Sequence, residues 1–280
     1  MKTNIYLAQV SPTLGNLEKN LEICTLEIKK AILQNAGLIV FPELALTGYY
    51  LKDLVDRVSL SLNDKKLTPI IKLSQKIDIV ISFVEEDEQH RLFISAAYLS
   101  ANSIIHVHRK VYLPTYGMFE DRRYFTSGHS FVSFETKLGK VSLLICEDAW
   151  HLEAPLIAAL EGTQYIIVIS SSPVQGISKN KLVAEENWGT ILKTYALLLG
   201  AYVIYVNRVG CEDGVTFWGG SFICGPDGVI LGQAKIIEAD ALSLTIDSAE
   251  IKRQRQRLPL IKEQKMMLLK ENLDRIDDRS

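Results

Sequence analysis

The sequence lacks the features that mark secreted proteins, membrane-spanning proteins and small domains stabilised by a structural metal. Its four cysteines show no paired spacing, which argues against a disulfide framework or a zinc knuckle and indicates reduced thiols. They are Cys24, Cys146, Cys211 and Cys224. No apolar run approaches the roughly 18 residues of a membrane span, and the N-terminus lacks the long apolar core of a secretory signal. We therefore expect a cytoplasmic protein.

An excess of charge of either sign is also absent. The chain carries 33 acidic and 31 basic residues, for a formal net charge of -2. Recruitment of nucleic acid or of a membrane surface depends on a strong field of one sign, which this balance does not supply. We expect no nucleic-acid and no membrane partner, and instead a small molecule or another protein.

Flexible linkers, internal repeats and low-complexity segments are missing as well. At 280 residues the chain is long enough for one large α/β domain with a deep core, so we expect residues 1–280 to form a single domain. Residues 251–280 begin with basic positions and continue with a run of apolar ones. This tail is too apolar to be solvated, and we expect it to pack on a neighbouring subunit or back across the domain.

What the sequence does contain is a succession of strand-like and helix-like segments. Short apolar runs rich in β-formers predict strands over residues 4–10, 37–41, 77–84, 91–100, 103–108, 131–134, 140–145, 165–169, 202–206, 218–224, 229–233 and 241–246. Helical spacing predicts helices over residues 17–31, 51–60, 67–76, 152–160 and 181–199. A hairpin between 91–100 and 103–108 makes the sheet mixed. Residues 110–128 show no steady period and predict a long structured loop.

Three reactive side chains follow predicted strands. Glu43, Lys110 and Cys146 each lie at or just beyond a strand end, where α/β sheets place their sites. Taken singly, such a Glu or Lys is usually solvated and such a Cys usually packs in a core. Together they supply what a thiol needs to hydrolyse an amide, namely a base, a cation for the oxyanion and an acid for the leaving amine.

The sequence around these residues resembles the nitrilase, or carbon-nitrogen hydrolase, superfamily. The resemblance rests on Phe41–Tyr49, Arg109–Pro114 and Ile145–Trp150, in family order, with supporting blocks at residues 207–210, 217–222 and 226–228. It implies a four-layer α-β-β-α sandwich that pairs into a homodimer or a higher homo-oligomer. It also implies that Glu43 is the general base, Lys110 the oxyanion stabiliser and Cys146 the nucleophile.

Within the superfamily, residues 113–119 and 123–125 are most similar to the glutamine amidohydrolase domain of glutamine-dependent NAD synthetases. We find no Ser-Gly-Gly loop of the kind that binds ATP phosphate. We therefore expect the synthetase domain to be absent and the protein not to adenylate a substrate.

The resemblance also implies further site residues. An auxiliary carboxylate is expected near Lys110, and either Asp121 or Glu120 stands there. The oxyanion and substrate pocket is expected to include Glu147, Tyr49, Tyr116 and Ser172. Lys179 stands where an arginine is expected to hold the α-carboxylate of glutamine; it supplies charge without the bidentate fork of a guanidinium, which weakens the case for free glutamine.

The expected activity is that of an amidohydrolase. It would cleave a small primary amide or carbamoyl compound through a Cys thioester and release ammonia, without a cofactor or a metal. One alternative is a glutaminase that supplies ammonia to a separate partner enzyme; another is a catalytically silent interaction protein. A nitrile hydrolase ranks third among the enzymes.

The histidines predict less. A Cys-His hydrolase using His151 is disfavoured because this residue begins the following helix. His106 and His108 share one strand face without a third ligand nearby, so we expect a surface or rim pair and no metal.

Overall fold

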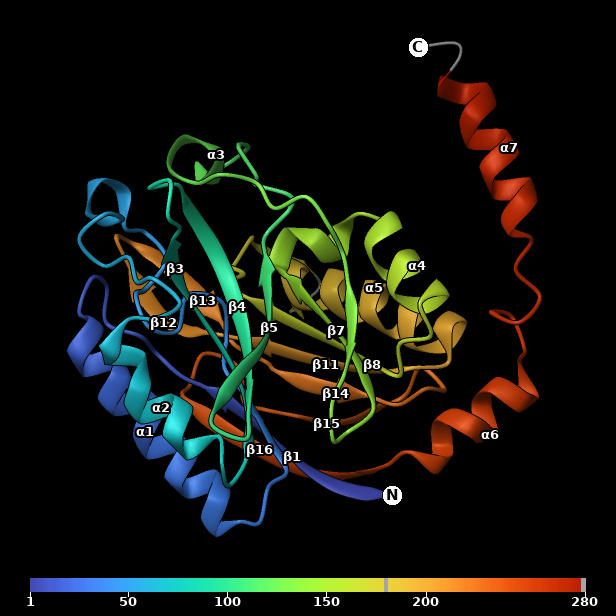
Figure 1. Ribbon diagram of the computed structural model, residues 1–280, viewed down its shortest axis with the longest axis horizontal. Coiled ribbons are helices and arrows are strands. Elements are labelled where there is room, and N and C mark those ends of the chain that lie inside the picture. The colour runs from blue at the N-terminus through green and yellow to red at the C-terminus, as the bar shows by residue number, and fades with distance from the viewer. Residues whose placement is uncertain (179–180, 278–280) are drawn as a thin grey trace.

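The computed structural model describes residues 1–178 and 181–277 as two six-stranded β-sheets, stacked face to face with helices outside them (Figure 1). The first sheet contains β1 (Lys2–Gln9), β2 (Leu38–Val40), β3 (Asp78–Glu86), β4 (Leu92–Ser100), β5 (Ser103–Arg109) and β16 (Asp240–Asp247), in the order β16-β1-β2-β3-β4-β5. The second contains β6 (Ser133–Glu135), β7 (Lys140–Ile145), β8 (Tyr165–Ser170), β11 (Tyr202–Asn207), β14 (Phe222–Cys224) and β15 (Ile230–Gln233), in the order β15-β14-β11-β8-β7-β6. This is the expected α/β sandwich.

Both sheets have a parallel centre with antiparallel strands at the edges. β1, β2 and β3 run parallel in the first sheet, and β7, β8 and β11 run parallel in the second. The predicted hairpin is confirmed, because β3, β4 and β5 pair antiparallel in sequence. The carboxyl ends of parallel strands meet at one edge of a sheet, so residues that follow them are brought together.

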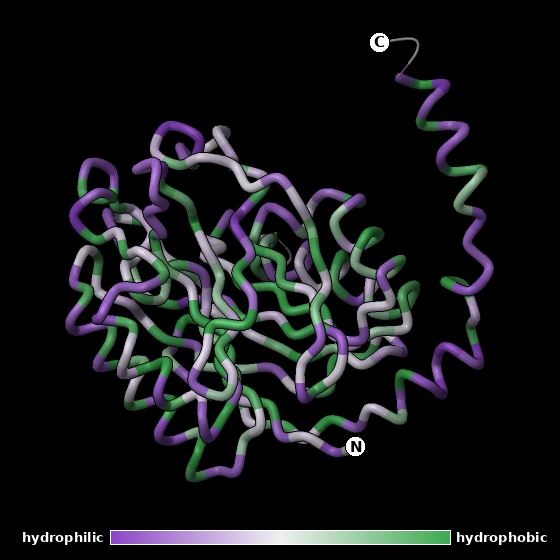
Figure 2. The backbone as a smooth tube through the Cα atoms, viewed as in Figure 1, coloured by the Kyte–Doolittle hydropathy of each residue, from purple (hydrophilic) through white to green (hydrophobic). Residues whose placement is uncertain are grey.

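The alternation of side chains along the strands divides the core into two parts. In β1, Ile5 and Leu7 face the second sheet, whereas Tyr6 and Ala8 face the outer helices. Those helices are α1 (Leu17–Leu33) and α2 (Thr68–Leu73), and the second sheet is covered by α4 (Glu153–Leu160) and α5 (Val183–Leu199) (Figure 1). Figure 2 shows the apolar strands enclosed by more polar helices and loops.

Helix α1 illustrates why these segments fold where they do. The Asn16 side chain accepts the backbone N–H of Lys19 at 3.1 Å and so caps the first turn. Cys24, Ile28 and Ala31 then recur on one face and are fully buried against the sheet. Cys24 is therefore a packing residue.

Several predicted elements differ in the structure. Residues 51–60 form only the short 3₁₀ turn Lys52–Leu54, because the Leu60 backbone instead pairs with β3. The predicted strand 218–224 is divided because Gly219 and Gly220 have φ of 70° and 61°, which turns the chain. The helix predicted from residue 181 begins at Val183. The predicted strand 131–134 is shifted to β6.

Smaller elements complete the chain. The hairpin of β12 (Val209–Glu212) and β13 (Val215–Trp218) was not predicted, although the Asp213-Gly214 dipeptide at its turn is a recognised hairpin signal. The loop 110–128 contains the single-turn helix α3 (Asp121–Tyr124). The remaining short elements are β9 (Ile177–Ser178), β10 (Lys181–Leu182) and the 3₁₀ turns Lys65–Leu67 and Cys146–Trp150.

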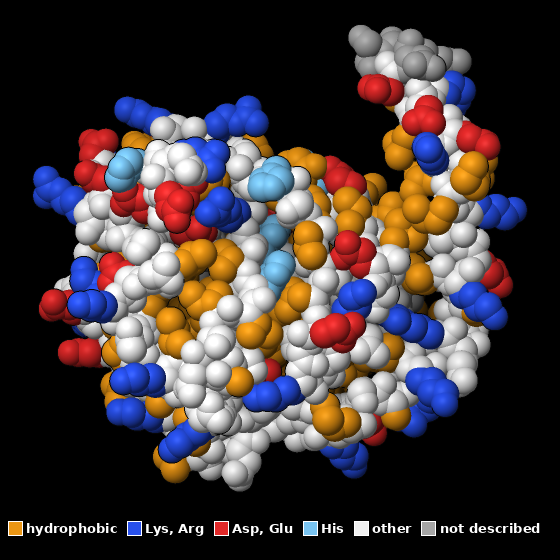
Figure 3. Space-filling model, viewed as in Figure 1, with side chains coloured by type: hydrophobic (Ala, Val, Ile, Leu, Met, Phe, Trp, Pro, Cys, Tyr) orange, Lys and Arg blue, Asp and Glu red, His pale blue; other side chains and the backbone are white. Residues whose placement is uncertain are grey.

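The C-terminal tail forms two helices with different surroundings. α6 (Ala249–Arg257) buries Ile251 against the domain. α7 (Met266–Asp277) stands away from the body in Figure 1, and Figure 3 shows apolar side chains on its surface. Met267 and Leu273, for example, are 69% and 56% exposed. Packing of α7 on a partner subunit stays a prediction. In the part of the chain that the structure describes, no helix combines the length and apolarity needed to cross a bilayer.

Candidate active site

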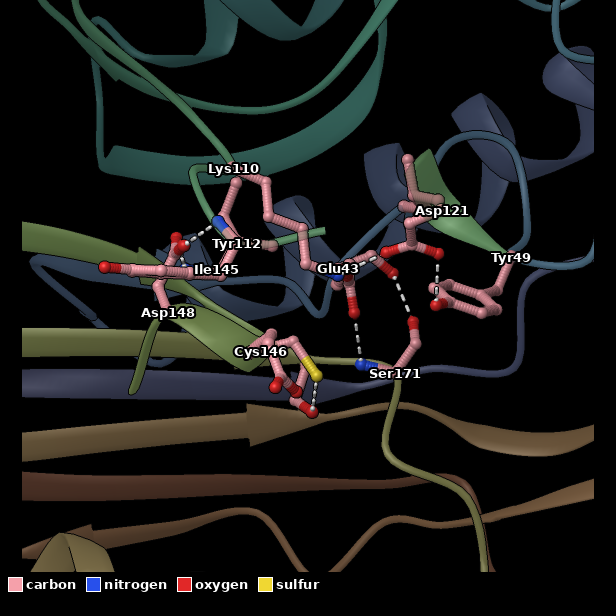
Figure 4. Close-up of polar contacts among 12 residues, drawn as sticks. Glu43, Tyr49, Lys110, Tyr112, Asp121, Ile145, Cys146, Asp148 and Ser171 are labelled. Carbon is pink, nitrogen blue, oxygen red and sulfur yellow. Dashed lines mark hydrogen bonds and ion pairs between the residues drawn. The ribbon is translucent and has the colours of Figure 1, made fainter. Parts of the chain in front are cut away.

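The two sheets bring Glu43, Lys110 and Cys146 into one buried site. Glu43 follows β2 and Lys110 follows β5, both in the first sheet, whereas Cys146 follows β7 in the second. Figure 4 shows the three side chains converging between the sheets. All three are at most 8% exposed. The juxtaposition that sequence analysis inferred from strand ends is therefore present.

Lys110 lies between two carboxylates. Its Nζ is 2.7 Å from Glu43 Oε1 and 2.7 Å from Asp121 Oδ2. Tyr49 donates its hydroxyl to the other Asp121 oxygen at 2.6 Å (Figure 4). Glu120 points elsewhere, with a side chain 56% exposed and 3.8 Å from Arg123. Of the two candidates for the auxiliary carboxylate, Asp121 is thus the one in contact with Lys110.

The charges in this group are not balanced, because two buried carboxylates share one ammonium. Burial raises the pKa of Glu43; Lys110 opposes this rise without cancelling it, and the charge of Asp121 adds to it. Burial alone would lower the pKa of Lys110, but the charges of Asp121 and Glu43 outweigh burial and raise that pKa. Lys110 therefore stays cationic, while Glu43 is poised to gain or lose a proton.

Cys146 is the first residue of the 3₁₀ turn that directly follows β7. Its φ of 48° is in the left-handed region, a conformation that costs a non-glycine residue on the order of 1–3 kcal/mol. Burial and the Glu43 carboxylate raise the pKa of the thiol, whereas Lys110 and a hydrogen bond from Ser170 lower it. Since the pKa of the thiol is raised overall, its proton has to be removed by a base when the sulfur attacks.

Asp148 connects the segment after Lys110 to the turn at Cys146. Its Oδ1 accepts the backbone N–H groups of Val111 and Tyr112, both at 3.0 Å. Its Oδ2 accepts the N–H of Ile145 at 3.0 Å and lies 2.8 Å from His108 Nε2. Asp148 is fully buried. One carboxylate thus holds two parts of the site, a role that sequence analysis missed although Asp148 lies in the Cys-Glu-Asp block.

The expectation of a surface or rim histidine pair is wrong for His108, which is 3% exposed because it reaches inward to Asp148. His106 stacks on Phe134, with ring centroids 4.0 Å apart. Both line a cavity of about 220 Å³. Within residues 1–178 and 181–277, no three His, Cys, Asp or Glu side chains are grouped to hold a metal ion.

Three consecutive serines, Ser170 at the end of β8 and the two residues after it, contact different parts of the site. Ser170 Oγ is 3.2 Å from Cys146 Sγ. The Ser171 N–H donates to Glu43 Oε2 at 2.8 Å, and its hydroxyl donates to the Glu43 carbonyl at 3.0 Å. Ser172 Oγ accepts two indole N–H groups, from Trp188 and Trp218, at 2.9 and 3.2 Å. Sequence analysis had singled out Ser172 alone.

The other predicted pocket residues are spread around the site. Tyr116 is 58% exposed and donates its hydroxyl to the Glu147 carboxylate at 2.8 Å, which places this pair near the surface. Tyr49 instead lies behind Asp121. Lys179 lies outside the described residues. His151 stacks on Tyr112, and no hydrogen bond joins it to Cys146 among the residues described.

The chain belongs to the carbon-nitrogen hydrolase family, whose model matches residues 5–256. It is therefore a nitrilase-superfamily carbon-nitrogen hydrolase. The glutamine-dependent NAD(+) synthetase of Acinetobacter baylyi is 33% identical over 230 residues, which cover 82% of this chain and 41% of that protein. The N-carbamoylputrescine amidase of Arabidopsis thaliana is 28% identical over 250 residues, which cover 82% of this chain and 81% of that amidase. The crystal structure of a carbon-nitrogen hydrolase from Helicobacter pylori superposes on this structure with a TM-score of 0.84 at 26% identity. The superposition covers 98% of this chain and 99% of that one.

The relatives differ in length. The chain spans less than half the length of the NAD synthetases it matches, but most of the length of the amidase and of the Helicobacter pylori hydrolase.

Proposed function

We propose that the protein is an amidohydrolase that cleaves a non-peptide C–N bond of a small primary amide or carbamoyl compound through a Cys146 thioester and releases ammonia. The observation that carries the proposal is the buried Glu43 carboxyl. It is bonded to Lys110 at 2.7 Å, its pKa is raised, and it shares a site with the strained Cys146. A carboxyl whose pKa is raised in this way can take the proton of the thiol and return it to the leaving group.

Acylation begins when Glu43 takes the thiol proton and the sulfur attacks the amide carbonyl carbon. The oxygen that becomes negative is received by the Lys110 ammonium and by the backbone N–H of Glu147, which follows Cys146 in the turn. The protonated Glu43 then gives its proton to the departing amine, the C–N bond breaks and ammonia leaves. An acyl group remains on Cys146 as a thioester.

Deacylation uses the same groups in reverse. Glu43 removes a proton from water, the hydroxide attacks the thioester carbonyl carbon, and the C–S bond breaks as the acid product forms. Glu43 then returns its proton to the Cys146 sulfur, which restores both groups. Asp121 stays beside Lys110 throughout, so it supplies the negative charge that keeps Lys110 protonated while Glu43 changes state. Tyr49 in turn holds Asp121 in place.

The substrate class rests on two observations. The Tyr116–Glu147 pair offers a negative, hydrogen-bonding group near the surface, which fits a substrate with an amino group beyond its amide. The similarity to an amidase named for N-carbamoylputrescine, over most of both chains, supports a carbamoyl compound. A second candidate is a glutaminase that supplies ammonia to a separate partner enzyme, supported by the 33% identity to an NAD synthetase.

The test is ammonia release from a panel of simple primary amides, carbamoyl amines and glutamine. We expect activity on the first two and a complete loss in Cys146→Ala, Glu43→Gln and Lys110→Ala, with circular dichroism showing that the fold persists. Preference for glutamine would favour the second candidate. Full activity in Cys146→Ala would refute the mechanism. A silent interaction protein would release no ammonia, and an alkylating reagent would label its thiols slowly and without selectivity.

We also propose that the protein forms a homodimer or a larger homo-oligomer in which the exposed apolar side chains of α7 are covered by a second copy. Their exposure motivates this proposal. A monomeric particle in small-angle scattering would contradict it.

A further inference from the structure

Ser170 is placed beside the reacting sulfur by the strand register. β7 and β8 run parallel with Ile145 opposite Ile169, so the residues that follow, Cys146 and Ser170, lie next to each other where the strands end. The Ser170 hydroxyl donates to Cys146 Sγ at 3.2 Å, drawn as the dashed line from the sulfur in Figure 4. Ser170 is fully buried.

The Ser170 hydroxyl is not needed elsewhere in the fold. Within the described part of the chain, its one hydrogen bond is to the sulfur, whereas its backbone carbonyl separately accepts the N–H of Arg208 at 3.3 Å. The buried Tyr205 hydroxyl has no hydrogen-bond partner within the described residues; burial raises its pKa, and Ser170 and Ser172 oppose the rise as nearby hydrogen-bonding groups. A hydroxyl has one proton to donate, and in this geometry Ser170 donates it to Cys146 at 3.2 Å.

A neutral donor is what the surroundings of the sulfur lack. The thiolate would form in a water-excluded site next to the Glu43 carboxyl, and the nearby cation, Lys110, is already bonded to two carboxylates. During attack Lys110 is required at the substrate oxygen. Ser170 supplies a hydrogen bond to sulfur that neither depends on Lys110 nor changes the charge of the site, and such a bond strengthens when the acceptor becomes an anion.

We propose that Ser170 is a further catalytic residue, whose hydroxyl stabilises the Cys146 thiolate when Glu43 takes its proton and again when the sulfur leaves the thioester. The proposal rests on the proposed function. The thiol proton goes to Glu43, and Ser170 keeps its own proton at every step. Because the donor acts on the anion, its loss makes the thiolate harder to form without altering substrate contacts.

The experiment measures the rate at which iodoacetamide alkylates Cys146 as a function of pH, in the full chain and with the labelled peptide identified by mass spectrometry. Ser170→Ala is expected to shift the midpoint of the profile upward by roughly one pH unit and to slow labelling below it by about tenfold, the effect of one hydrogen bond to an anion. It should lower kcat for amide hydrolysis with little change in KM. An unshifted profile in Ser170→Ala would overturn the proposal.

Ser142→Ala is the matched control. Ser142 is also buried, on β7, but its hydroxyl bonds to Ser133 and Thr163 at 2.7 Å each. It should leave the alkylation profile unchanged. An equal shift in this variant would mean that any buried serine deletion disturbs the sheet, which would also overturn the proposal.

The pair Ser170→Thr and Ser170→Val differs only in a hydroxyl against a methyl group, and it keeps the proposal testable if the alanine variant fails to fold. Threonine should restore the wild-type midpoint and valine should not; equal profiles would count against Ser170. Because alkylation reports on the thiol and not on turnover, the two proposals fail differently. If Cys146 is labelled selectively and Glu43→Gln abolishes this labelling, but the Ser170 variants label as the wild type does, only the inference about Ser170 is refuted. If the reagent labels all the thiols without selectivity, the proposed function is refuted.

Discussion

Replacing Asp148 by asparagine tests the view that one carboxylate holds the active site together. The substitution keeps the shape of the side chain and exchanges one acceptor oxygen for an NH₂ donor. If the NH₂ replaces Oδ1, the N–H groups of Val111 and Tyr112 lose their acceptor; if it replaces Oδ2, the N–H of Ile145 does. In either orientation at least one buried backbone donor faces another donor.

The cost follows from the number of these bonds. One buried donor without an acceptor costs about 1–3 kcal/mol, and a bond to a charged acceptor weakens by about 1 kcal/mol when the charge is lost. With the least costly orientation, which sacrifices the Ile145 bond and weakens the two others, the free energy of unfolding should fall by about 3–5 kcal/mol. The same change frees the segment after Lys110 from the turn at Cys146, so kcat should fall as well.

Urea denaturation followed by circular dichroism measures the first effect. Asp148→Asn should lower the unfolding midpoint at an unchanged m value. Asp53→Asn is the control, because Asp53 is exposed and a surface change should stay within about 0.5 kcal/mol. A loss below about 1 kcal/mol in Asp148→Asn, or unchanged ammonia release, would refute the reasoning.

Three further predictions concern other parts of the same framework. Tyr49→Phe removes the 2.6 Å hydrogen bond that holds Asp121 in place. We expect kcat for amide hydrolysis to fall roughly tenfold, and a steady-state rate equal to that of the wild type would contradict a role for Tyr49 in positioning Asp121. Glu212→Gln disrupts a buried ion pair with Arg208 and the hydrogen bonds that Glu212 accepts from the backbone N–H groups of Tyr49 and Tyr50. Thermal and urea unfolding should show that the free energy of unfolding falls by about 3 kcal/mol, and an unchanged unfolding midpoint would contradict this structural role. Burial lowers the pKa of His106 from 6.5 to about 4, so the unfolded chain binds the proton more readily and stability should fall as the pH drops from 6.5 towards 4. His106→Leu should remove this part of the acid-induced loss, which unfolding curves at pH 7 and pH 4.5 would show.

Segments whose environment is set by their own pattern were predictable. Helix α1 has an Asn16 cap and an apolar stripe, and the strand that delivers Cys146 is a short apolar run between polar residues. Such signals are local, because burial on one face imposes a period that the sequence repeats. Residues 51–60 departed from their helical spacing because Leu60 pairs with β3, a contact that no local pattern reveals.

The choice between Asp121 and Glu120 shows the same limit within the site. The two are adjacent carboxylates, and only the path of the loop decides which one meets Lys110. Asp148 and Ser170 were missed for a related reason: their partners lie 36 and 24 residues away in the chain, and the bonds exist because two strands end side by side.

The sequence by itself determined the class of the protein: short blocks around Glu43, Lys110 and Cys146 carry the reactive groups and the family resemblance that implies the four-layer sandwich, and periodicity indicates the individual strands and helices. Only the tertiary structure decided how those groups act on one another. It showed that burial outweighs Lys110 at Glu43, that Asp121 is the second carboxylate, and that Ser170 reaches the sulfur. Residue types are local information, whereas desolvation and hydrogen-bond distances depend on which distant segments pack together.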